Sequence, residues 1–380
     1  MEIQKATFTI PPPHFFPIPN STHHSVLVSP RHRLKQQRNF LKLSPLCCSS
    51  SHSHPVVQDP ILQEGNESFR KSRETHYKNS RKKRVFFLDV NPICYKGSIP
   101  SLQSFAHWIS LFFSQVSLTD PVIAVIDGER GNEYRRQLLP SYKAKRRKYW
   151  HQFPDAEKSQ RSTIEKSHRL ILDILQSCNV PVVKIESHEA DDVIATLVEQ
   201  VLQRGHRVVV ASPDKDFKQL ISDEVQIVMP VPEFNRWSFY TLKHYVAQYN
   251  CDPRSDLSLR CILGDEVDGV PGIQHVVPGF GRKTAMKLLK KHGTLENLLN
   301  AAAVRSVGRQ YAQDALIKYS DYLRRNYEVL SLKRDVSIHI EDQWLNERDA
   351  RNDSLVLSNF ITLLKDSRNL YSQSRSHSNG

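Results

Sequence analysis

Nine carboxylates of this chain fall into five short clusters, each at a place where a strand is expected to end or a loop to turn. They are Asp89, Asp127, Glu189, Asp191, Asp192, Asp214, Asp216, Asp265 and Asp268. Acids that converge on one place repel one another, and divalent cations commonly neutralise such clusters. Hard oxygen ligands suit Mg²⁺ or Mn²⁺, and a pair of such ions is the usual apparatus for cleaving phosphodiesters. The nine acids therefore predict a site for two Mg²⁺ ions, in which Mn²⁺ could substitute.

Three of these acids lie within four residues, at Glu189, Asp191 and Asp192, just ahead of an apolar run. Acids are common at helix starts, where the helix dipole stabilises negative charge. Three of them exceed what capping requires. On a helix, positions 189 and 192 share a face while 191 points elsewhere. We therefore expect one or two of the three to bind metal directly and the other to act through water.

Asp214 and Asp216 follow another apolar run and are separated by one lysine. In extended backbone, side chains at i and i+2 point the same way, so the two carboxylates are expected side by side. A turn with two solvated acids is the alternative.

Short apolar runs alternate with helical patterns through the first half of the folded region. We expect strands near 85–89, 121–127, 182–185, 207–211 and 226–229, and helices near 101–116 and 189–202. This alternation predicts an α/β fold with a parallel sheet and right-handed crossovers. Ligands of such sheets bind beyond the carboxyl ends of the strands, so Asp89, Asp127, Asp214 and Asp216 should share one rim. From Thr241 onward the pattern is helical.

A glycine hairpin, Gly279-Phe280-Gly281, directly precedes Arg282, Lys283 and Thr284 and an apolar-periodic helix. Such a hairpin ahead of a helix start presents backbone N–H groups to a phosphate. This form is typical of a helix–hairpin–helix, which grips duplex backbone without reading bases. Residues 274–277 are expected to bulge outward, and Gly281 is expected to need close backbone approach or a positive φ.

Residues 130–148 hold eight Lys/Arg and one acid, with Tyr134 and Tyr142 inside the stretch and Tyr149 and Trp150 directly after it. Basic residues can follow a phosphate backbone, and aromatic rings can stack on unpaired bases. A charge run is usually only a solvated face. Its place directly after the Asp127 strand favours a nucleic-acid interface.

The net charge of +13 is concentrated in the first 84 residues, which carry fourteen Lys/Arg and five acids. Residues 1–60 are rich in Ser, His and Pro and nearly free of acid, and they lack the apolar core of a secretory signal. This composition predicts a disordered organellar transit peptide, plastid in preference to mitochondrial, with a plain disordered tail as the alternative. The chain has no apolar run of the roughly 18–20 residues that span a bilayer, so no membrane partner is expected.

These motifs together resemble the 5′-3′ exonuclease and flap-endonuclease family, in particular the 5′ nuclease domain of bacterial DNA polymerase I, over about residues 85–335. The matching motifs, in order, are Asp89, Asp127, the series Arg135, Pro140, Tyr142, Lys143 and Arg146, the acids 189–192, the pair 214 and 216, and the pair 265 and 268. The resemblance implies a PIN-like (resolvase-like) parallel sheet flanked by helices, with a C-terminal helix-three-turn-helix. It also implies that the nine acids hold two Mg²⁺ ions.

The resemblance assigns further roles. Tyr142, Lys143 and Arg146 would be catalytic, with the two cations neutralising charge on the scissile phosphate. A helical arch near residues 130–160 would receive the free 5′ end. Nucleic-acid contacts would come from Arg135, Arg136, Gly279, Gly281, Arg282, Lys283 and Thr284. Gly269 stands where the family usually has Asn, and four extra residues split the hairpin, which bears on duplex binding and on a K⁺ ion expected there.

The expected organisation is a transit peptide (1–60), a charged linker (61–84), a nuclease domain (85–240), a helix–hairpin–helix region (241–335) and a partly disordered C-terminal extension (336–380). We expect a free-standing, monomeric 5′-3′ exodeoxyribonuclease and flap endonuclease. Its substrates would be DNA with free 5′ ends or flaps and RNA–DNA primers, in organellar replication and repair. The alternatives are a PIN-like ribonuclease for organellar RNA and a non-catalytic DNA-binding protein.

Overall fold

A computed structural model describes residues 82–96, 99–144 and 157–377, and all of them belong to one compact unit, Ser72–Gly380. The expectations for the leader, most of the linker, Arg146, Tyr149 and Trp150 lie outside the described residues. Among the described residues, no helix is both long and apolar enough to cross a membrane.

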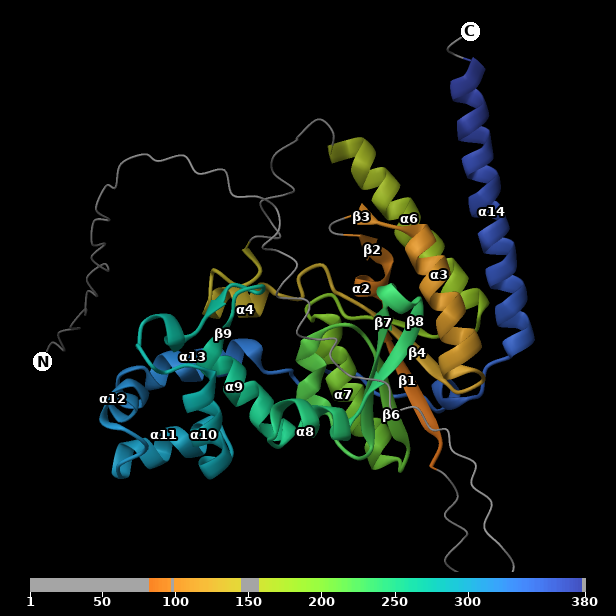
Figure 1. The fold of residues 1–380 in the computed structure, drawn as a ribbon. Coiled ribbons are helices and arrows are strands. Elements are labelled where there is room, and N and C mark those ends of the chain that lie inside the picture. Colours follow the sequence, from red (N-terminus) through yellow and green to blue (C-terminus); the bar gives the residue numbers. More distant parts are fainter. Residues whose placement is uncertain (1–81, 97–98, 145–156, 378–380) are drawn as a thin grey trace, which may run out of the picture. The chain divides into compact units, whose positions relative to one another are not determined.

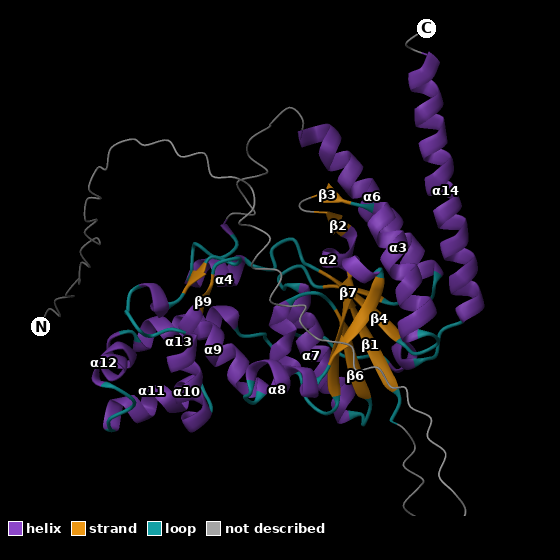
Figure 2. Cartoon of the chain, viewed as in Figure 1, coloured by secondary structure: helices purple, strands orange, loops and turns teal. Residues whose placement is uncertain are grey.

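A six-stranded sheet forms the centre of the N-terminal part, in the order β5-β4-β1-β6-β7-β8 (Figures 1 and 2). Five strands are parallel, and the last is antiparallel to its neighbour. Their bounds are β1 Arg84–Asp89, β4 Val122–Ile126, β5 Val182–Lys184, β6 Arg207–Ala211, β7 Val225–Val231 and β8 Arg236–Tyr240. The predicted parallel α/β sheet is confirmed.

The antiparallel edge strand β8 was not anticipated from the sequence. It pairs with β7 after a turn in which Asn235 adopts a left-handed conformation with φ of 50°. Trp237 is its only fully buried side chain, and its indole N–H donates to the carbonyl of Trp108 at 3.1 Å. A strand with one buried residue lacks the apolar run that marks the other five.

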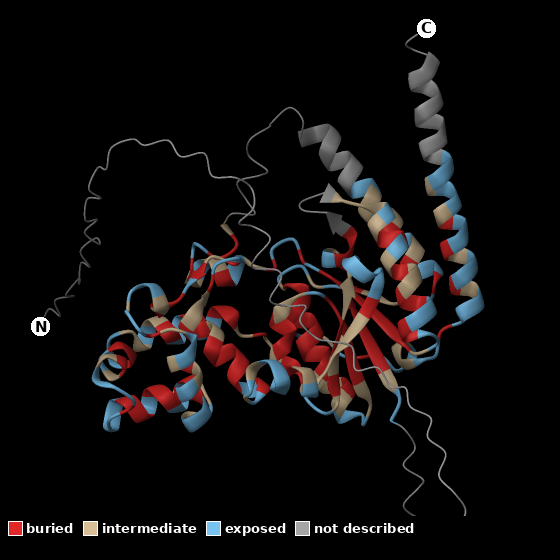
Figure 3. Ribbon diagram, in the orientation of Figure 1, coloured by how far each residue is buried: buried red, intermediate tan, exposed pale blue. Residues whose placement is uncertain are grey.

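Helices cover both faces of the sheet because alternate strand residues point to opposite sides. Phe86 and Leu88 face α3 (Leu102–Phe112), its π-helical continuation to Ser117, α6 (Glu157–Ser177) and α14 (Ala350–His377). Val85 and Phe87 face α7 (Ala190–Gln203). Figure 3 shows the buried sheet between these layers. Shorter elements complete this part: α2 Val90–Cys94, β2 Tyr95–Lys96, β3 Ile99–Pro100 and α4 Glu133–Leu138.

The following segment is helical, as predicted, and has a separate apolar core that includes Phe280, Leu289 and Leu316. Its helices are α8 Leu242–Tyr249, α9 Asp256–Leu263, α10 Arg282–His292, α11 Leu295–Val304, α12 Gln310–Lys318 and α13 Ser320–Leu330. A two-stranded ribbon, β9 Gly264–Asp265 and β10 Val270–Pro271, lies between α9 and α10.

The described part of the C-terminal segment, which we predicted to be partly disordered, joins the fold. Leu357 and Phe360 of α14 are buried in the core beneath α3, and the helix continues to His377 despite its serine content. Ahead of it, residues 332–340 lie along α7. Asp192, Thr196 and Gln200, spaced one helical turn apart, accept backbone N–H groups of Lys333, Val336 and Ile340.

Candidate metal centre and nucleic-acid interface

The acids of the first strands meet at the carboxyl edge of the sheet, as predicted. Asp89 ends β1 and is buried, and the hydroxyl of Ser212, which follows β6, donates to its Oδ2 at 2.8 Å. Burial, and next the charge of Asp127, raise the pKa of Asp89 well above its usual range. Asp127 follows β4 and accepts hydrogen bonds from Asn91 Nδ2 at 2.6 Å and from the backbone N–H of Ala190 at 2.8 Å.

Asp214 has extended backbone, but Asp216 lies on a 3₁₀ turn (Lys215–Leu220), which corrects the prediction that both acids lie on one extended segment. Asp214 caps this turn, and its Oδ1 accepts the N–H of Asp216 at 2.9 Å. The two carboxylates are nonetheless neighbours. Burial, and then the charge of Asp216, raise the pKa of Asp214 to about 7.

Glu189 and Asp192 share one face at the start of α7, as expected for this spacing, and both bind Arg135. Arg135 Nη1 lies 2.8 Å from Glu189 Oε2, and Nη2 lies 2.6 Å from Asp192 Oδ1. Because Asp192 also receives the N–H of Lys333, both of its oxygens have protein partners. Asp192 is thus held by protein donors in this structure, and its predicted role as a metal ligand stays a prediction.

Arg135 cannot have the DNA-binding role predicted for it. Its side chain is 3% exposed, and besides the two acids it donates to the carbonyls of Val329 and Ser331. The buried Arg135 guanidinium, whose donors are occupied, therefore links α4 to α7 and to the end of α13. Arg136, the next residue, is partly buried.

Asp191, the remaining acid of this cluster, is 9% exposed. Burial, and then the charge of Glu189, raise its pKa well above the usual range. Its Oδ1 accepts the N–H of Asp192 at 2.8 Å. Asp89, Asp191 and Asp214 are thus three acids whose negative charge the surrounding protein does not fully compensate; we call them the uncompensated acids.

Asp216, Asp265 and Asp268 form a second group, the ribbon-side acids, whose ligand atoms lie within 4.8 Å of one another. Arg260 and Lys215 contact this group. Arg260 Nη2 lies 2.8 Å from Asp265 Oδ2 and 2.6 Å from Asp216 Oδ1, the latter without hydrogen-bond geometry. Burial opposes ionisation of Asp265, but hydrogen bonds from Lys215 and Arg260 outweigh it and lower its pKa.

The donor chemistry of both groups fits divalent metal ions. All candidate ligands are carboxylate oxygens, which hard cations prefer. The three ribbon-side acids are close enough for one cation. Burial, and then the charge of neighbouring acids, raise the pKa of each uncompensated acid, and a bound cation would offset both effects. Two-ion binding is therefore compatible with this chain.

Lys143 lies between the two groups. Its ammonium pairs with Glu189 and is buried, and its charge also acts on Asp191 and Asp268. Burial lowers the pKa of Lys143, but the Glu189 carboxylate and its neighbours raise it well above the ordinary value. Tyr142 is 2% exposed and donates its hydroxyl to Glu189 at 3.0 Å, so it positions Glu189 and is too buried to stack on a base.

The glycine hairpin has its positive φ at Gly279 (84°) and not at Gly281, which is extended at −92° and has open space where a Cβ would lie. The prediction for Gly281 is corrected accordingly. Gly281 precedes the first turn of α10, where the N–H groups are free to meet an anion. A hollow of about 500 Å³ lies here, lined by Gln274, His275, Gly279, Gly281, Arg282, Lys283 and Thr284. His275 and Val276 of the extra segment are exposed, as an outward bulge requires.

The Gly279 carbonyl already has two protein donors, and the K⁺ predicted at the hairpin stays a prediction. That oxygen already accepts the hydroxyls of Thr284 at 2.9 Å and Tyr311 at 3.1 Å. Tyr311 comes from the start of α12, so α12 closes the hairpin from behind. The sequence offered no sign of this contact, which joins residues 32 positions apart.

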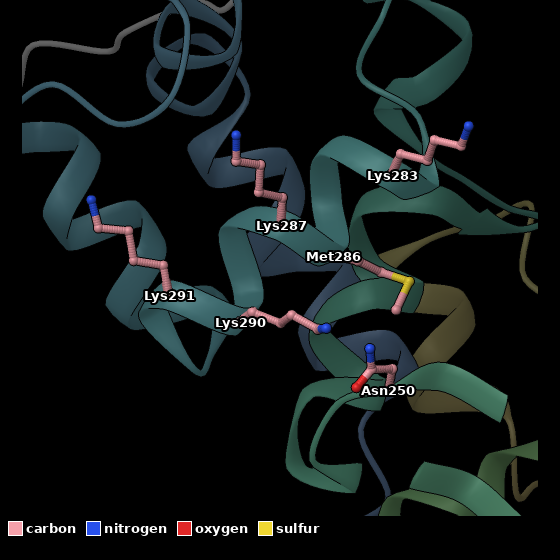
Figure 4. Close-up of a pocket in the computed structure, with 6 residues that line it drawn as sticks. All are labelled: Asn250, Lys283, Met286, Lys287, Lys290 and Lys291. Atoms are coloured by element: carbon pink, nitrogen blue, oxygen red, sulfur yellow. The ribbon is translucent and has the colours of Figure 1, made fainter. Parts of the chain in front are cut away.

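A basic groove of about 590 Å³ adjoins the hairpin along α10 (Figure 4). Its lining consists of Asn250, Lys283, Met286, Lys287, Lys290 and Lys291, and we call it the lysine groove. Figure 4 shows Lys290 reaching toward Asn250, which follows α8. From the sequence, Lys287, Lys290 and Lys291 were expected to add positive charge at the hairpin, and their spacing of three and four places them on neighbouring turns.

Comparison with known proteins agrees with this geometry. Residues 94–250 match the N-terminal resolvase-like domain of the 5′-3′ exonucleases, and residues 252–353 match their C-terminal SAM fold. A 5′-3′ exonuclease of Aquifex aeolicus is 27% identical over 273 residues, covering 69% of this chain and 86% of the relative. DNA polymerase I of Mycobacterium tuberculosis is 34% identical over 219 residues, or 57% of this chain and 22% of the polymerase.

Solved structures support the fold. The D15 protein of bacteriophage T5, crystallised with metal ions, has a TM-score of 0.55 at 22% identity and covers 75% of this chain and 99% of its own. The D15 flap endonuclease in complex with DNA and metal ions has a TM-score of 0.53 at 20% identity, covering 73% of this chain and 100% of its own. The chain belongs to the 5′-3′ exonuclease family.

Proposed function

We propose that this protein is a divalent-metal-dependent 5′-3′ exonuclease and 5′-flap endonuclease that hydrolyses DNA phosphodiesters, with Mg²⁺ as its metal. The observation that carries the proposal is the meeting of two acid groups around Lys143. The uncompensated acids, the ribbon-side acids and the buried Lys143 ammonium together form a site. Such a site can hold a phosphodiester and the cations that neutralise it.

Each of the two acid groups would bind one metal ion. The ribbon-side acids would hold one ion and the uncompensated acids the other. When bound, two such ions supply an activated water and stabilise charge on the phosphate. Lys143 would offer its ammonium to the scissile phosphate, a contact that requires it to leave Glu189 or share it. Tyr142 and Arg135 keep Glu189 in place during that exchange.

The duplex arm of the substrate would lie on α10. The N–H groups ahead of α10 suit a phosphate, and the lysine groove continues positive charge along the same helix. These contacts address backbone and not base edges, which fits a nuclease that selects DNA structure over sequence. We include RNA-primed 5′ ends among the substrates and a monomeric state in this proposal.

The test uses the full chain on a 5′-flap duplex under single-turnover conditions. Cleavage near the flap junction is expected with Mg²⁺ and none with EDTA. The variant Asp214→Asn/Asp216→Asn should lose cleavage yet bind the duplex within a few fold, because α10 supplies the affinity. Turnover in this double variant would refute the metal-site assignment.

Matched DNA, RNA and RNA-primed flaps decide between substrate classes in the same assay. Faster cleavage of an all-RNA flap would support the ribonuclease alternative. Binding without cleavage of any flap would support the non-catalytic one. Size-exclusion chromatography with light scattering checks the monomer.

We also propose that residues 1–60 direct the protein to the plastid, with the mitochondrion as the alternative, for primer and flap removal in organellar replication and repair. The support is the acid-poor, Ser- and basic-rich composition of this segment. Residues 1–60 fused to a fluorescent protein should be imported into the organelle. A diffuse cytosolic or nuclear signal would refute the localisation.

A further inference from the structure

The segment that carries Lys143 rests directly on the loop that carries Asp268. The backbone N–H of Lys143 donates to the carbonyl of Asp268 at 2.8 Å. The hydroxyl of Ser141 donates to the carbonyl of Gly269 at 2.7 Å. Two hydrogen bonds thus join segments 125 to 128 residues apart in the chain. One segment supplies the buried cation of the site and the other supplies one of its acids.

Gly269 makes this close approach possible. Its φ is 72°, and a Cβ built there would lie 2.2 Å from the carbonyl oxygen of Ser141. Such a separation is far below van der Waals contact, and the opposing atom is backbone, which cannot rotate away. With the backbone as it lies in this chain, a side chain at position 269 therefore requires Ser141 and its neighbours to move off the loop.

The contact of the Ser141–Lys143 backbone with the Asp268–Gly269 loop, which we call the seat, also maintains an unfavourable backbone conformation at Lys143. Lys143 has φ of 50°, a left-handed conformation that is unfavourable for a residue with a side chain. Strain of this kind persists only where the surroundings impose it, and it occurs often at functional sites. In this conformation the Lys143 ammonium reaches Glu189. Without the seat, Lys143 would relax and its ammonium would leave the acids.

We propose that Gly269 is a positioning residue: by admitting the Ser141–Lys143 backbone onto the Asp268–Gly269 loop, it places the Lys143 ammonium between the two acid groups. This inference rests on the proposed function for its catalytic consequence, but the placement of Lys143 can be tested without cleavage.

The chain offers variants that separate the two effects of a side chain at position 269. Gly269→Asn introduces the clashing Cβ, whereas asparagine tolerates a left-handed φ. Gly205→Ala is the matched control, because Gly205 has φ of 80° with nothing within 4 Å of a Cβ. Ser141→Ala removes one hydrogen bond of the seat without adding atoms, and it serves if Gly269→Asn does not fold.

The first readout is the reactivity of the Lys143 amine toward an acylating reagent in the metal-free protein, followed by mass spectrometry. Lys143 should be protected in the wild type and in Gly205→Ala, and labelled several-fold faster in Gly269→Asn, with a smaller increase in Ser141→Ala. Unchanged protection in both Gly269→Asn and Ser141→Ala would overturn the inference, whatever the protein cleaves.

The second readout is a double-mutant cycle on the single-turnover cleavage rate. Lys143→Ala should lower the rate by roughly 10²-fold, by analogy with the loss of one transition-state donor. Gly269→Asn should lower it at least 10-fold with duplex affinity within two-fold of wild type, and should add little in the Lys143→Ala background. A full additional loss in that background would show that Gly269 does not act through Lys143. Inactivity of the wild type would refute the proposed function alone, leaving the labelling result to decide the inference.

Discussion

Burial that the surrounding protein does not fully compensate determines the pKa values of Asp89, Asp191 and Asp214. Each has a raised pKa because its charged form loses water and faces other acids. The sequence could place Asp89 and Asp214 on one rim, since strand ends in a parallel sheet share an edge, and it placed Asp191 at the start of a helix. It could not distinguish them from Asp192, whose two oxygens are occupied by an arginine 57 positions earlier and a backbone N–H 141 positions later.

The raised pKa of Asp214 predicts a pH-dependent effect of metal on stability. A carboxyl whose folded pKa exceeds its unfolded value of 3.8 holds its proton better when folded, so its contribution to stability falls as pH rises toward about 7. A metal ion needs the ionised carboxylate. The rise in melting temperature on adding Mn²⁺ should therefore be larger at pH 8 than at pH 6, as measured by differential scanning fluorimetry.

The variant Asp214→Asn is the control for this experiment, since it should reduce the Mn²⁺ effect and flatten the pH dependence of the metal-free protein. The comparison is needed because burial lowers the pKa of His168 and His292, which works in the opposite direction. If Mn²⁺ raised the melting temperature equally at both pH values, the charge of these acids would not be uncompensated in the metal-free protein.

At the scale of elements, local patterns predicted the hairpin and the start of α10 correctly but not the glycine that needs a positive φ. Tyr311, which is distant in sequence, packs at ordinary van der Waals distance, 3.5 Å from where a Cβ of residue 279 would lie. Likewise, the sequence alone does not distinguish buried from exposed basic residues. Arg135 is buried, whereas Lys287 and Lys290 are exposed on α10. Burial of a charge is a tertiary property, so a charge run cannot reveal it.

The lysine groove predicts a salt-dependent contribution to duplex binding. Lys287→Ala/Lys290→Ala should weaken binding of a blunt duplex about equally for unrelated sequences, because the partner is phosphate. If both lysines contact phosphates, the slope of log K against log salt should fall by up to about 1.8, at 0.9 per phosphate. Fluorescence anisotropy between 50 and 200 mM salt measures this slope.

Lys365→Ala serves as the matched control, since Lys365 is an exposed lysine on α14 outside the groove. It should leave affinity and slope unchanged. If the wild type and both variants gave equal slopes, the part of α10 beyond its first turn would not belong to the duplex interface.

At the scale of the whole molecule, α14, the last described helix, packs with α3 against the N-terminal sheet. The parallel sheet was predictable because buried strands form continuous apolar runs. The return of the chain over α7 and α3 was not, because residues 332–340 donate backbone N–H groups to side chains of α7 and α14 is rich in serine. The hydrogen bond from the Ile340 backbone N–H to the Gln200 side chain, for example, makes no demand on the residue type at position 340.

Phe360 tests whether α14 is integral to the nuclease fold. It is 1% exposed and packs edge-on against Phe105 of α3, with ring centroids 6.2 Å apart. Phe360→Ala should reduce the free energy of unfolding by about 3–5 kcal/mol, because it removes buried apolar contacts and leaves a cavity. Leu355→Ala, on the same helix at 62% exposure, should change it by less than about 0.5 kcal/mol. Urea denaturation measures both, and similar midpoints for the two variants would mean that α14 does not contribute to the stability of the sheet domain.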